Sequence, residues 1–407
     1  MRKVVRAAAA VFDFLTVITL LLIFYMEYEL PDQYYVLEGE TVRFSYPVLL
    51  DTPEQPLEGA ETAGESYQVD LKLMGAIPIK TVEVSVVDRK MVRVSGAPFG
   101  IKMFTDGLMV VGMSEVTGEG QRINPAREAG VEIGDIIETV NGVRLRTNEQ
   151  LGELVEQSGG EPVELTVRRG EEQLTFQVRP VQSVGDRKYR LGVWVRDSSA
   201  GIGTMTYYDP NSGLFTGLGH AVCDVDTGEL MPLSDGEIVS AEITGCKRGE
   251  SGEPGELKGR FSSGSALGWL SANTPTGVYG YLQSRSVYLG EEVPVALSHE
   301  VRPGRAVIRT TISGSIPREY EVELEKISTG SGAGGQNMIV HVTDPELLAQ
   351  TGGIVQGMSG SPILQNGMLV GSVTHVFVND PTRGFGIFAE TIYNDAKNMC
   401  GTVDNAA

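Results

Sequence analysis

The chain opens with a long apolar run and then changes to short segments in which hydrophobic and polar residues alternate. The apolar run covers residues 7–26, and its 20 residues match the length of a helix that crosses the hydrocarbon core of a membrane. Residues 80–87, 163–168 and 173–179 alternate with a period of two, which predicts half-buried β-strands. The pattern therefore predicts one apolar helix at the amino terminus, followed by a mostly β protein.

The flanks of the apolar run indicate its orientation. Arg2, Lys3 and Arg6 precede it, and basic flanks stay on the cytoplasmic side of a membrane. The run ends in bulky residues, whereas a secretory signal peptide ends in a cleavage site made of small residues. We therefore expect residues 1–26 to form a cytoplasmic flank and a single-pass transmembrane anchor, with the bulk of the chain outside the cytoplasm. A cleaved export signal is the alternative.

The next segment, residues 27–95, is expected to connect the anchor to the rest of the chain and to support it. Residues 51–66 carry five acidic side chains, two Pro and two Gly without periodicity, which is typical of an exposed, flexible tether. Alternating segments on both sides of this tether predict a small β region.

Composition narrows the classes of partner and cofactor. Among 407 residues, 33 basic and 53 acidic side chains leave a net charge of −20, which disfavours binding to nucleic acid. Three Cys without CxxC spacing and four His offer neither a disulfide scaffold nor a recognisable zinc site, so each thiol is expected to be buried and unpaired. We expect no metal and no cofactor.

A peptide-binding module is predicted over residues 96–183. The pairs Pro125-Ala126, Ala129-Gly130, Gly134-Asp135 and Asn141-Gly142 resemble the bacterial PDZ domain, which implies an α/β fold. Local chemistry agrees with this resemblance, because Gly130 suits a left-handed helix cap and Asn-Gly suits a tight hairpin turn. A second helix is expected after Thr147, which is three residues before Gln150 in capping-box spacing.

PDZ domains add an extended peptide as a strand to a sheet edge. They hold its free carboxylate on an apolar-Gly-apolar loop, and Phe99-Gly100-Ile101 is the predicted loop here. Gly107 and Gly112 offer rival turns. The module would bind peptide segments or carboxyl termini; the alternative is that it only braces its neighbour.

The carboxy-terminal part, residues 184–407, contains a candidate nucleophile. The hexapeptide from Gly357 to Pro362 reads GMSGSP and places Ser359 on a tight turn. Serine peptidases of the chymotrypsin type carry this G-x-S-G-x-P pattern around the reactive serine. The backbone N–H groups of Gly357 and Ser359 are the expected oxyanion hole.

A serine hydroxyl needs a base, and only four His are available. His220 lies in a Gly-Leu-Gly-His turn 139 residues before Ser359, a separation that suits two β-barrels contributing one catalytic residue each. His375 lies 16 residues after Ser359 and is the rival. Asp344 is the candidate acid that would orient the base; the other interpretation of Asp344 is a helix N-cap before Pro345.

Several segments together resemble the stage IV sporulation protein B family, peptidase family S55. They are RDSSAGIGTMTYYDP, GLGHAVCDVDTGE and IVQGMSGSPILQNGMLVGSVTHVFVNDPTRGFGIFAE, besides the anchor and the PDZ motif. The resemblance implies a chymotrypsin-like double β-barrel serine peptidase with His220, Asp344 and Ser359 as catalytic residues.

The same resemblance implies a place and a role. The enzyme would sit between forespore and mother cell, cut itself and then cleave a regulatory subunit of an intramembrane protease complex, so that a late sigma factor becomes active. The tether predicts that self-cleavage falls within residues 27–75, because an unfolded segment is the easiest substrate. The alternative function is a membrane-anchored PDZ adaptor whose peptidase-like domain is inactive.

Overall fold

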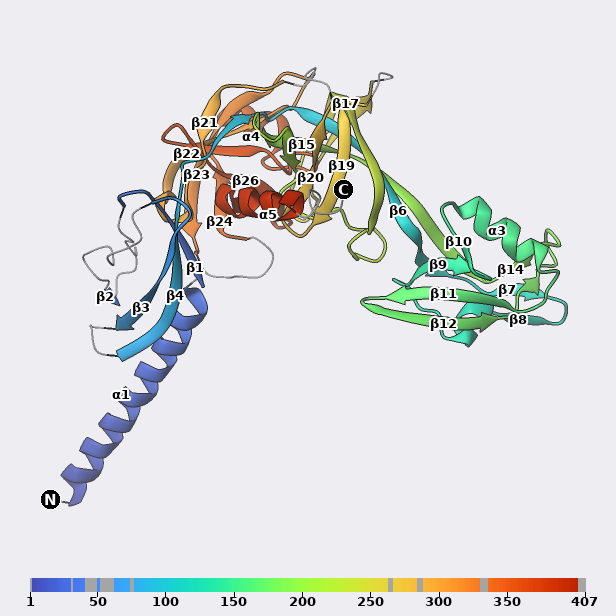
Figure 1. Cartoon of the computed structure of the whole chain (residues 1–407), viewed down its shortest axis with the longest axis horizontal. Helices are drawn as coiled ribbons and strands as arrows, with labels where there is room; N and C mark the ends of the chain where they lie inside the picture. The colour runs from blue at the N-terminus through green and yellow to red at the C-terminus, as the bar shows by residue number, and fades with distance from the viewer. Residues whose placement is uncertain are drawn as a thin grey trace.

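The structure is a computed structural model that describes residues 2–30, 32–40, 50–51, 62–73, 77–262, 266–283, 288–329 and 336–401. Figure 1 shows a long amino-terminal helix with a small sheet, a central body of β-strands, and an α/β module joined to that body by a two-stranded ribbon. The mostly β prediction is confirmed, and so is the small β region between the helix and the module.

The helix α1 (Arg2–Glu29) forms where the apolar run predicts it. Among the described residues, however, none of the helices has both the length and the hydropathy that a membrane crossing requires. The helical part of the prediction is therefore confirmed and the transmembrane part is not.

A four-stranded sheet follows the helix, in the order β1 (Gln33–Leu37), β4 (Ile77–Val87), β3 (Ser66–Leu73) and β2 (Leu50–Asp51). Its core includes Val82 and Val84 together with Met26 and Leu30 at the end of α1. Most of the predicted tether, residues 52–61, lies outside the described residues.

Two β-barrels form the central body. In the first, pairing returns to its starting strand in the order β6 (Pro98–Met113), β17 (Leu233–Lys247), β19 (Gly268–Thr274), β20 (Gly277–Leu282), β16 (Leu214–Gly217) and β15 (Val193–Tyr208). The second is a closed barrel of β22 (Gly304–Thr310), β23 (Arg318–Ile327), β24 (Met338–Val342), β27 (Asp380–Phe388), β26 (Met368–Phe377) and β25 (Pro362–Gln365). The double-barrel architecture predicted for this half is therefore present in the described residues.

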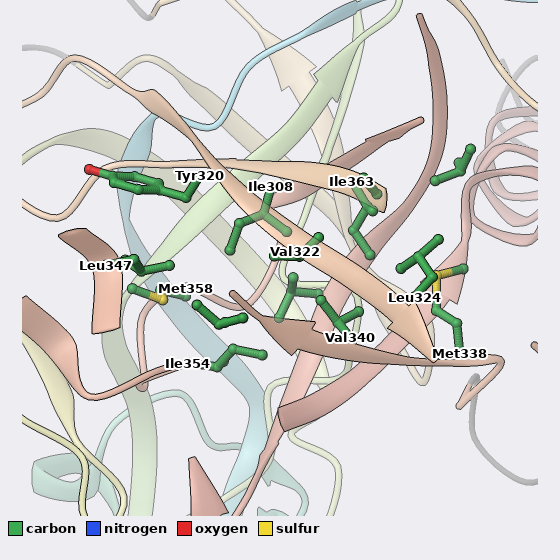
Figure 2. Close-up of a cluster of buried hydrophobic side chains, with 14 of the residues drawn as sticks. Ile308, Tyr320, Val322, Leu324, Met338, Val340, Leu347, Ile354, Met358 and Ile363 are labelled. Atoms are coloured by element: carbon green, nitrogen blue, oxygen red, sulfur yellow. The ribbon is translucent and has the colours of Figure 1, made fainter. Parts of the chain in front are cut away.

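The core of the second barrel is drawn in Figure 2. Alternating strand residues such as Val322 and Leu324 fill it, as the period-two pattern requires. Leu347 of helix α4 (Pro345–Thr351) and Met358 belong to the same buried cluster (Figure 2). Helix α4 and the loop of the candidate nucleophile are thus held by one core. A last helix, α5 (Ala389–Gly401), packs beside β26 and β27.

The α/β module contains α2 (Pro125–Ala129), β9 (Ile136–Val140), β10 (Val143–Arg144), α3 (Asn148–Gln157), β11 (Val163–Arg169) and β12 (Glu172–Val178). Its local predictions are confirmed. Gly130 caps α2 with a φ of 103°, Thr147 caps α3 by accepting from the N–H of Gln150, and Asn141-Gly142 turns with two positive φ values. Asn124 adds an unforeseen cap, accepting from the N–H of Arg127 at 2.9 Å.

The module is inserted into the first barrel rather than placed before it. Strands β6 and β15 pair along their whole length, from Thr204↔Pro98 in the barrel to Val193↔Met113 in the module. Strand β5 (Met91–Val94) also belongs to the central body, because it pairs with β15 and with β21 (Glu292–Pro294). The peptidase body therefore includes strands on both sides of the module, which the boundaries at residues 96 and 184 missed.

Candidate active site

The loop that carries Ser359 is clamped by strand β15 of the first barrel. The N–H of Thr204 donates to the carbonyl of Ser359 at 3.0 Å, and its hydroxyl donates to the carbonyl of Gly357 at 2.8 Å. The hydroxyl of Thr206 donates to the carbonyl of Gly360 at 2.8 Å. Gly360 has a φ of +95°, and a Cβ atom there would lie 1.9 Å from the Thr204 carbonyl oxygen. The second glycine of the motif is therefore required by this close approach.

Backbone N–H groups in this loop fall into two classes. Those of Met358, Gly360 and Ser361 donate to carbonyls of Val355, Val373 and Met358, at 2.8–3.1 Å. Those of Gly357 and Ser359 have no hydrogen-bond acceptor within the part of the chain that the structure describes. These two are the N–H groups that the sequence assigns to an oxyanion hole, and they are left available for a ligand.

Of the two serines in the motif, Ser359 is the one at the surface of the site. Its side chain is half-buried, and its hydroxyl donates to the carbonyl of Thr374 on β26 at 2.6 Å. Ser361 is fully buried and donates to the carbonyl of Met358 at 2.6 Å. Ser361 is therefore a structural residue of the turn.

His220 comes from the first barrel and faces the same stretch of β26. It follows β16 on a sharp turn in which Leu218 and Gly219 both have a φ of 67°. A Cβ atom on Gly219 would lie 3.1 Å from side-chain atoms of Ser372 and of Thr374, so the turn rests directly on β26. Since Ser359 bonds to Thr374, the candidate base and the candidate nucleophile meet at one short segment of the second barrel.

The hydrogen bond of His220 indicates its tautomer. Its Nδ1 lies 2.7 Å from the carbonyl oxygen of Ala221, which can only accept, so Nδ1 carries the proton and Nε2 of the neutral ring is free to accept one. Burial, and to a smaller extent the neighbouring His375, lowers the pKa of His220 to about 4 although the Ala221 hydrogen bond opposes this. At neutral pH the imidazole is therefore uncharged, as a general base must be.

The structure does not bring Asp344 to His220. One carboxylate oxygen of Asp344 accepts from the N–H of Leu347 at 2.9 Å and the other accepts from the N–H of Glu321 at 3.3 Å. Asp344 is thus the N-cap of α4, with Pro345 in the first turn, which was its alternative interpretation. Within the described residues no carboxylate contacts His220. A catalytic role for Asp344 stays a prediction.

The remaining histidines have separate places. The ring of His375 lies 4.6 Å from that of His220, tilted by 36°, and burial lowers its pKa. His341 pairs with Glu325 at 2.9 Å on the outside of the barrel, and His299 lies in a short 3-10 turn (Ser298–Glu300). Among the residues described, no three of His, Cys, Asp or Glu are grouped as metal ligands.

The loop after His220 is tied to the inserted module. Asp224 accepts from the N–H groups of Asp226 and Thr227, each at 3.0 Å, and pairs with Arg196 near the start of β15. The carboxylate of Asp224 therefore shapes its own loop, residues 224–228. Cys223 in this loop is exposed, so the expectation of a buried thiol is wrong for it.

A family model described as SpoIVB peptidase S55 matches residues 187–393, about half of the chain. The chain belongs to the SpoIVB peptidase S55 family. A second model, described as PDZ domain, matches residues 124–169. This SpoIVB-family peptidase therefore carries a PDZ domain, and the resemblance read from the sequence is confirmed.

Solved structures resemble parts of this family member at low identity. The PDZ domain of an SdrC-like protein from Listeria monocytogenes is 15% identical, covers 22% of the chain and 87% of its own, and gives a TM-score of 0.19. An inactive serine-to-alanine mutant of Rv3671c from M. tuberculosis is 11% identical, with 49% and 82% covered and a TM-score of 0.28. Deg5 is 14% identical, with 48% and 81% covered and a TM-score of 0.29. A search of curated protein sequences returned no match.

The predicted peptide-binding loop of this SpoIVB-family PDZ domain was wrong. Phe99, Gly100 and Ile101 lie within β6, where they pair with β15 on one side and β17 on the other. Phe99 is fully buried against Phe215, with ring centroids 6.0 Å apart. A strand that is paired on both edges has no free N–H groups for a carboxylate, so this segment belongs to the barrel core.

A groove of about 580 Å³ lies instead between α3 and the start of β15. Leu151 and Val155 of α3 line it, together with Leu191, Gly192 and Val193. The N–H groups of Leu191 and Gly192 have no acceptor among the residues described, and Gly192 has a φ of +82°. This segment, which follows β14 (Tyr189–Arg190), also has the apolar-Gly-apolar pattern of a carboxylate-binding loop. The sequence therefore contained this pattern at a second place, which the sequence analysis did not consider.

Proposed function

We propose that this chain is a sporulation serine endopeptidase. It cuts itself and then cleaves a regulatory membrane protein of an intramembrane protease complex, which carries a signal between forespore and mother cell to a late sigma factor. Family membership supports the biological setting. The observation that carries the chemistry is the convergence of Ser359 and His220, one from each barrel, on Thr374 and its neighbours in β26.

In the proposed reaction, the hydroxyl of Ser359 leaves the Thr374 carbonyl and attacks the scissile carbonyl carbon of a bound peptide. Nε2 of His220 takes the hydroxyl proton, while Nδ1–H stays on the Ala221 carbonyl. The carbonyl oxygen becomes negatively charged and is met by the N–H groups of Gly357 and Ser359. His220 then returns the proton to the leaving amine. A water molecule completes the cycle by the reverse steps, releasing the new carboxylate.

Asp344 is proposed as the third member because it matches the family motif. To reach His220, its carboxylate would have to release the N–H groups of Leu347 and Glu321. Giving up a helix N-cap costs about 1 kcal/mol, which a charge-assisted bond to an imidazolium can offset. Until such a bond forms, the hydrogen bond to the Ala221 carbonyl orients His220.

We further propose that the peptidase acts outside the cytoplasm, in the space between forespore and mother cell. The basic flank and the apolar residues 7–26 support export, either as an anchor or as a signal. Side chains of α1 that no other element covers support it too, since Phe12 is 70% exposed and Phe24 is 71% exposed. Self-cleavage within residues 27–75 would cut the covalent link between α1 and the part of the chain that forms the barrels and the PDZ domain.

A fluorophosphonate probe tests the chemistry directly, because only an activated serine is labelled. The full chain should be labelled at Ser359, and Ser359→Ala should abolish both labelling and the appearance of new amino termini. Ser361→Ala serves as the matched control and should retain labelling, since Ser361 only supports the turn. A wild-type chain that folds and is never labelled would instead assign this protein as a PDZ adaptor with an inactive barrel.

A further inference from the structure

A hairpin of the first barrel reaches across to the loop that carries Ser359. It consists of the end of β17 and of β18 (Glu256–Phe261), which pair with each other in antiparallel register. The loop between these strands rests on the second barrel, where the N–H of Gly249 donates to the carbonyl of Thr351 at 2.8 Å. Leu257 of β18 is buried in the hydrophobic core of the second barrel. The hairpin therefore joins the two barrels beside the candidate nucleophile.

The hairpin holds Gln356, the residue before Gly357, by its backbone. The N–H of Leu257 donates to the carbonyl of Gln356 at 2.8 Å, and the N–H of Gln356 donates to the carbonyl of Gly255 at 2.9 Å. The side chain of Gln356 is exposed, so packing of that side chain does not fix the residue. By contrast, Met358 is buried in the core of the second barrel (Figure 2). The position of Gln356 therefore depends on its two bonds to the hairpin.

Gln356 and Gly357 are the central residues of a tight turn. The N–H of Met358 donates to the carbonyl of Val355 at 3.1 Å, and Gly357 has a φ of +96°. A positive φ at the third residue is typical of a type II turn. Because Gly adopts either sign of φ readily, the same four residues could also form a type I turn. In that turn the peptide between Gln356 and Gly357 is turned over.

The orientation of this peptide decides whether the oxyanion hole is complete. In a trans peptide the C=O and N–H groups point in opposite directions. The Gln356 carbonyl points to the N–H of Leu257, so the N–H of Gly357 points the other way, where it has no acceptor among the described residues. Turning the peptide over would break the bond to Leu257 and take the Gly357 N–H out of the hole. The N–H of Ser359 would then be the single donor of the pair.

We propose that Leu257 is a positioning residue of the peptidase, whose N–H group keeps the Gly357 N–H in the oxyanion hole. The proposal rests on the serine peptidase function proposed above. The side chain of Leu257 supports the same position, because a Cβ atom on Gly357 would lie 3.1 Å from the Cβ atom of Leu257. The first barrel then serves the reaction twice, with His220 as the base and Leu257 behind the oxyanion hole.

The variant Leu257→Pro tests this role, because it deletes an N–H group that points to Gln356 and not to β17. Leu257→Ala is the matched control, since it loses the side chain and keeps the N–H group. Loss of one oxyanion-hole donor slows catalysis by about 10²–10³-fold, so Leu257→Pro should be labelled by the fluorophosphonate at least about tenfold more slowly than Leu257→Ala. Equal rates in these two folded variants would overturn the proposal.

Two further readouts separate positioning from support of the fold. A variant that was only less stable would give less labelled protein, with an unchanged rate constant for the folded fraction. We expect complete labelling with a lower rate constant, and the same dependence on acid because His220 keeps its surroundings. In phosphorus NMR of the labelled enzyme, the phosphonyl oxygen reports its hydrogen bonds in the hole. The signal of Leu257→Pro should lie closer to that of the denatured adduct than the signal of Leu257→Ala does, and identical signals would contradict the proposal.

A second pair of variants keeps the proposal testable if Leu257→Pro does not fold. A Cβ atom on Gly255 would lie 2.4 Å from the backbone nitrogen of Gly249 and 2.7 Å from Cγ1 of Val355, so Gly255→Ala forces the hairpin away from the loop. Gly245→Ala in the same hairpin is the control, because nothing lies within 4 Å of a Cβ atom there. Gly255→Ala should slow labelling and Gly245→Ala should not; equal rates would refute the role of the hairpin.

Failure of this proposal can be told apart from failure of the proposed function. A wild-type chain that folds and is never labelled refutes both. A wild type that is labelled, with Leu257→Pro and Gly255→Ala reacting at the rates of their controls, refutes the positioning role alone and leaves the peptidase function standing.

Discussion

The low pKa of His220 makes a specific prediction about acid. At pH 5.5 an imidazole with the ordinary pKa of about 6.5 would be only about 9% neutral, whereas His220, with a pKa of about 4, stays about 97% neutral. In the proposed mechanism the neutral ring is the base that activates Ser359, so the rate of fluorophosphonate labelling at pH 5.5 should remain close to its value at pH 8. Labelling rates measured at half-unit steps from pH 4 to 8 report this pKa in the free enzyme.

The variant His375→Ala supplies the internal comparison. The ring of His375 lies 4.6 Å from the ring of His220, so removing it reduces the burial of His220 and removes the positive charge that His375 carries once acid has protonated it. Both changes raise the pKa of His220. Its acid limb should move towards pH 6.5 while labelling at pH 8 is kept. A wild-type rate that falls about tenfold between pH 8 and 5.5, with a midpoint near 6.5, would refute the assigned environment of His220.

The stability of the fold should depend on the protonation of the same residue. The pKa of His220 is lower in the folded chain than in the unfolded one, so the unfolded chain binds the proton first as acid is added. Its contribution to stability is complete above about pH 6.5 and is lost as the pH falls towards 4. Denaturant midpoints of the wild type and of His220→Ala, measured at pH 7.5 and 5, should therefore converge at the lower pH.

Three further predictions concern positions around the site. Asp344→Asn should leave the melting temperature unchanged, because Asn caps a helix as well as Asp does. If the carboxylate of Asp344 stabilises the His220 imidazolium, labelling of Ser359 should fall by up to about 10⁴-fold. Unchanged labelling would mean that the Ala221 carbonyl, and not Asp344, orients His220. Thr206→Val removes the buried hydrogen bond to Gly360 and should lower the free energy of unfolding by about 1–3 kcal/mol in urea titrations, with slower labelling, whereas an unchanged midpoint would show that this clamp is dispensable. Gly192→Val places a Cβ atom 2.7 Å from a backbone oxygen at a φ of +82°, so it should abolish binding of carboxy-terminal peptides in fluorescence anisotropy without blocking labelling; retained peptide binding would place the ligand elsewhere.

Local signals in the sequence were sufficient for the local structure. The caps at Gly130 and Thr147 and the turn at Asn141-Gly142 need only a few neighbouring residues, and each forms where the sequence predicts it. The tight turn at Ser359 is similar, since the two glycines with positive φ values, Gly357 and Gly360, lie only three positions apart in the chain. The capping of α4 by Asp344 was also readable from the following Pro.

Contacts between distant segments could not be predicted in the same way. Phe99-Gly100-Ile101 and Leu191-Gly192-Val193 have the same apolar-Gly-apolar pattern, and only the pairing of β6 with β17, more than 130 residues later, shows that the first is barrel core. The hydrophobic pattern of one strand does not show which other strand pairs with it. That no carboxylate among the described residues contacts His220 is likewise a matter of long-range placement.

The ribbon of β6 and β15 determines how this protein can be divided. Phe104 pairs with Ser198 where the two strands leave the barrel, so the whole PDZ domain occupies the position of a hairpin loop. A fragment that begins at residue 184 would lack β6, and it would leave β15 and β17 as unpaired strand edges that are prone to aggregation. Deleting residues 106–196, which include the PDZ domain, and joining residue 105 to residue 197 through a short turn would instead keep the barrel closed. By the same geometry, an ancestral peptidase could have acquired its PDZ domain in a single insertion without repacking either core.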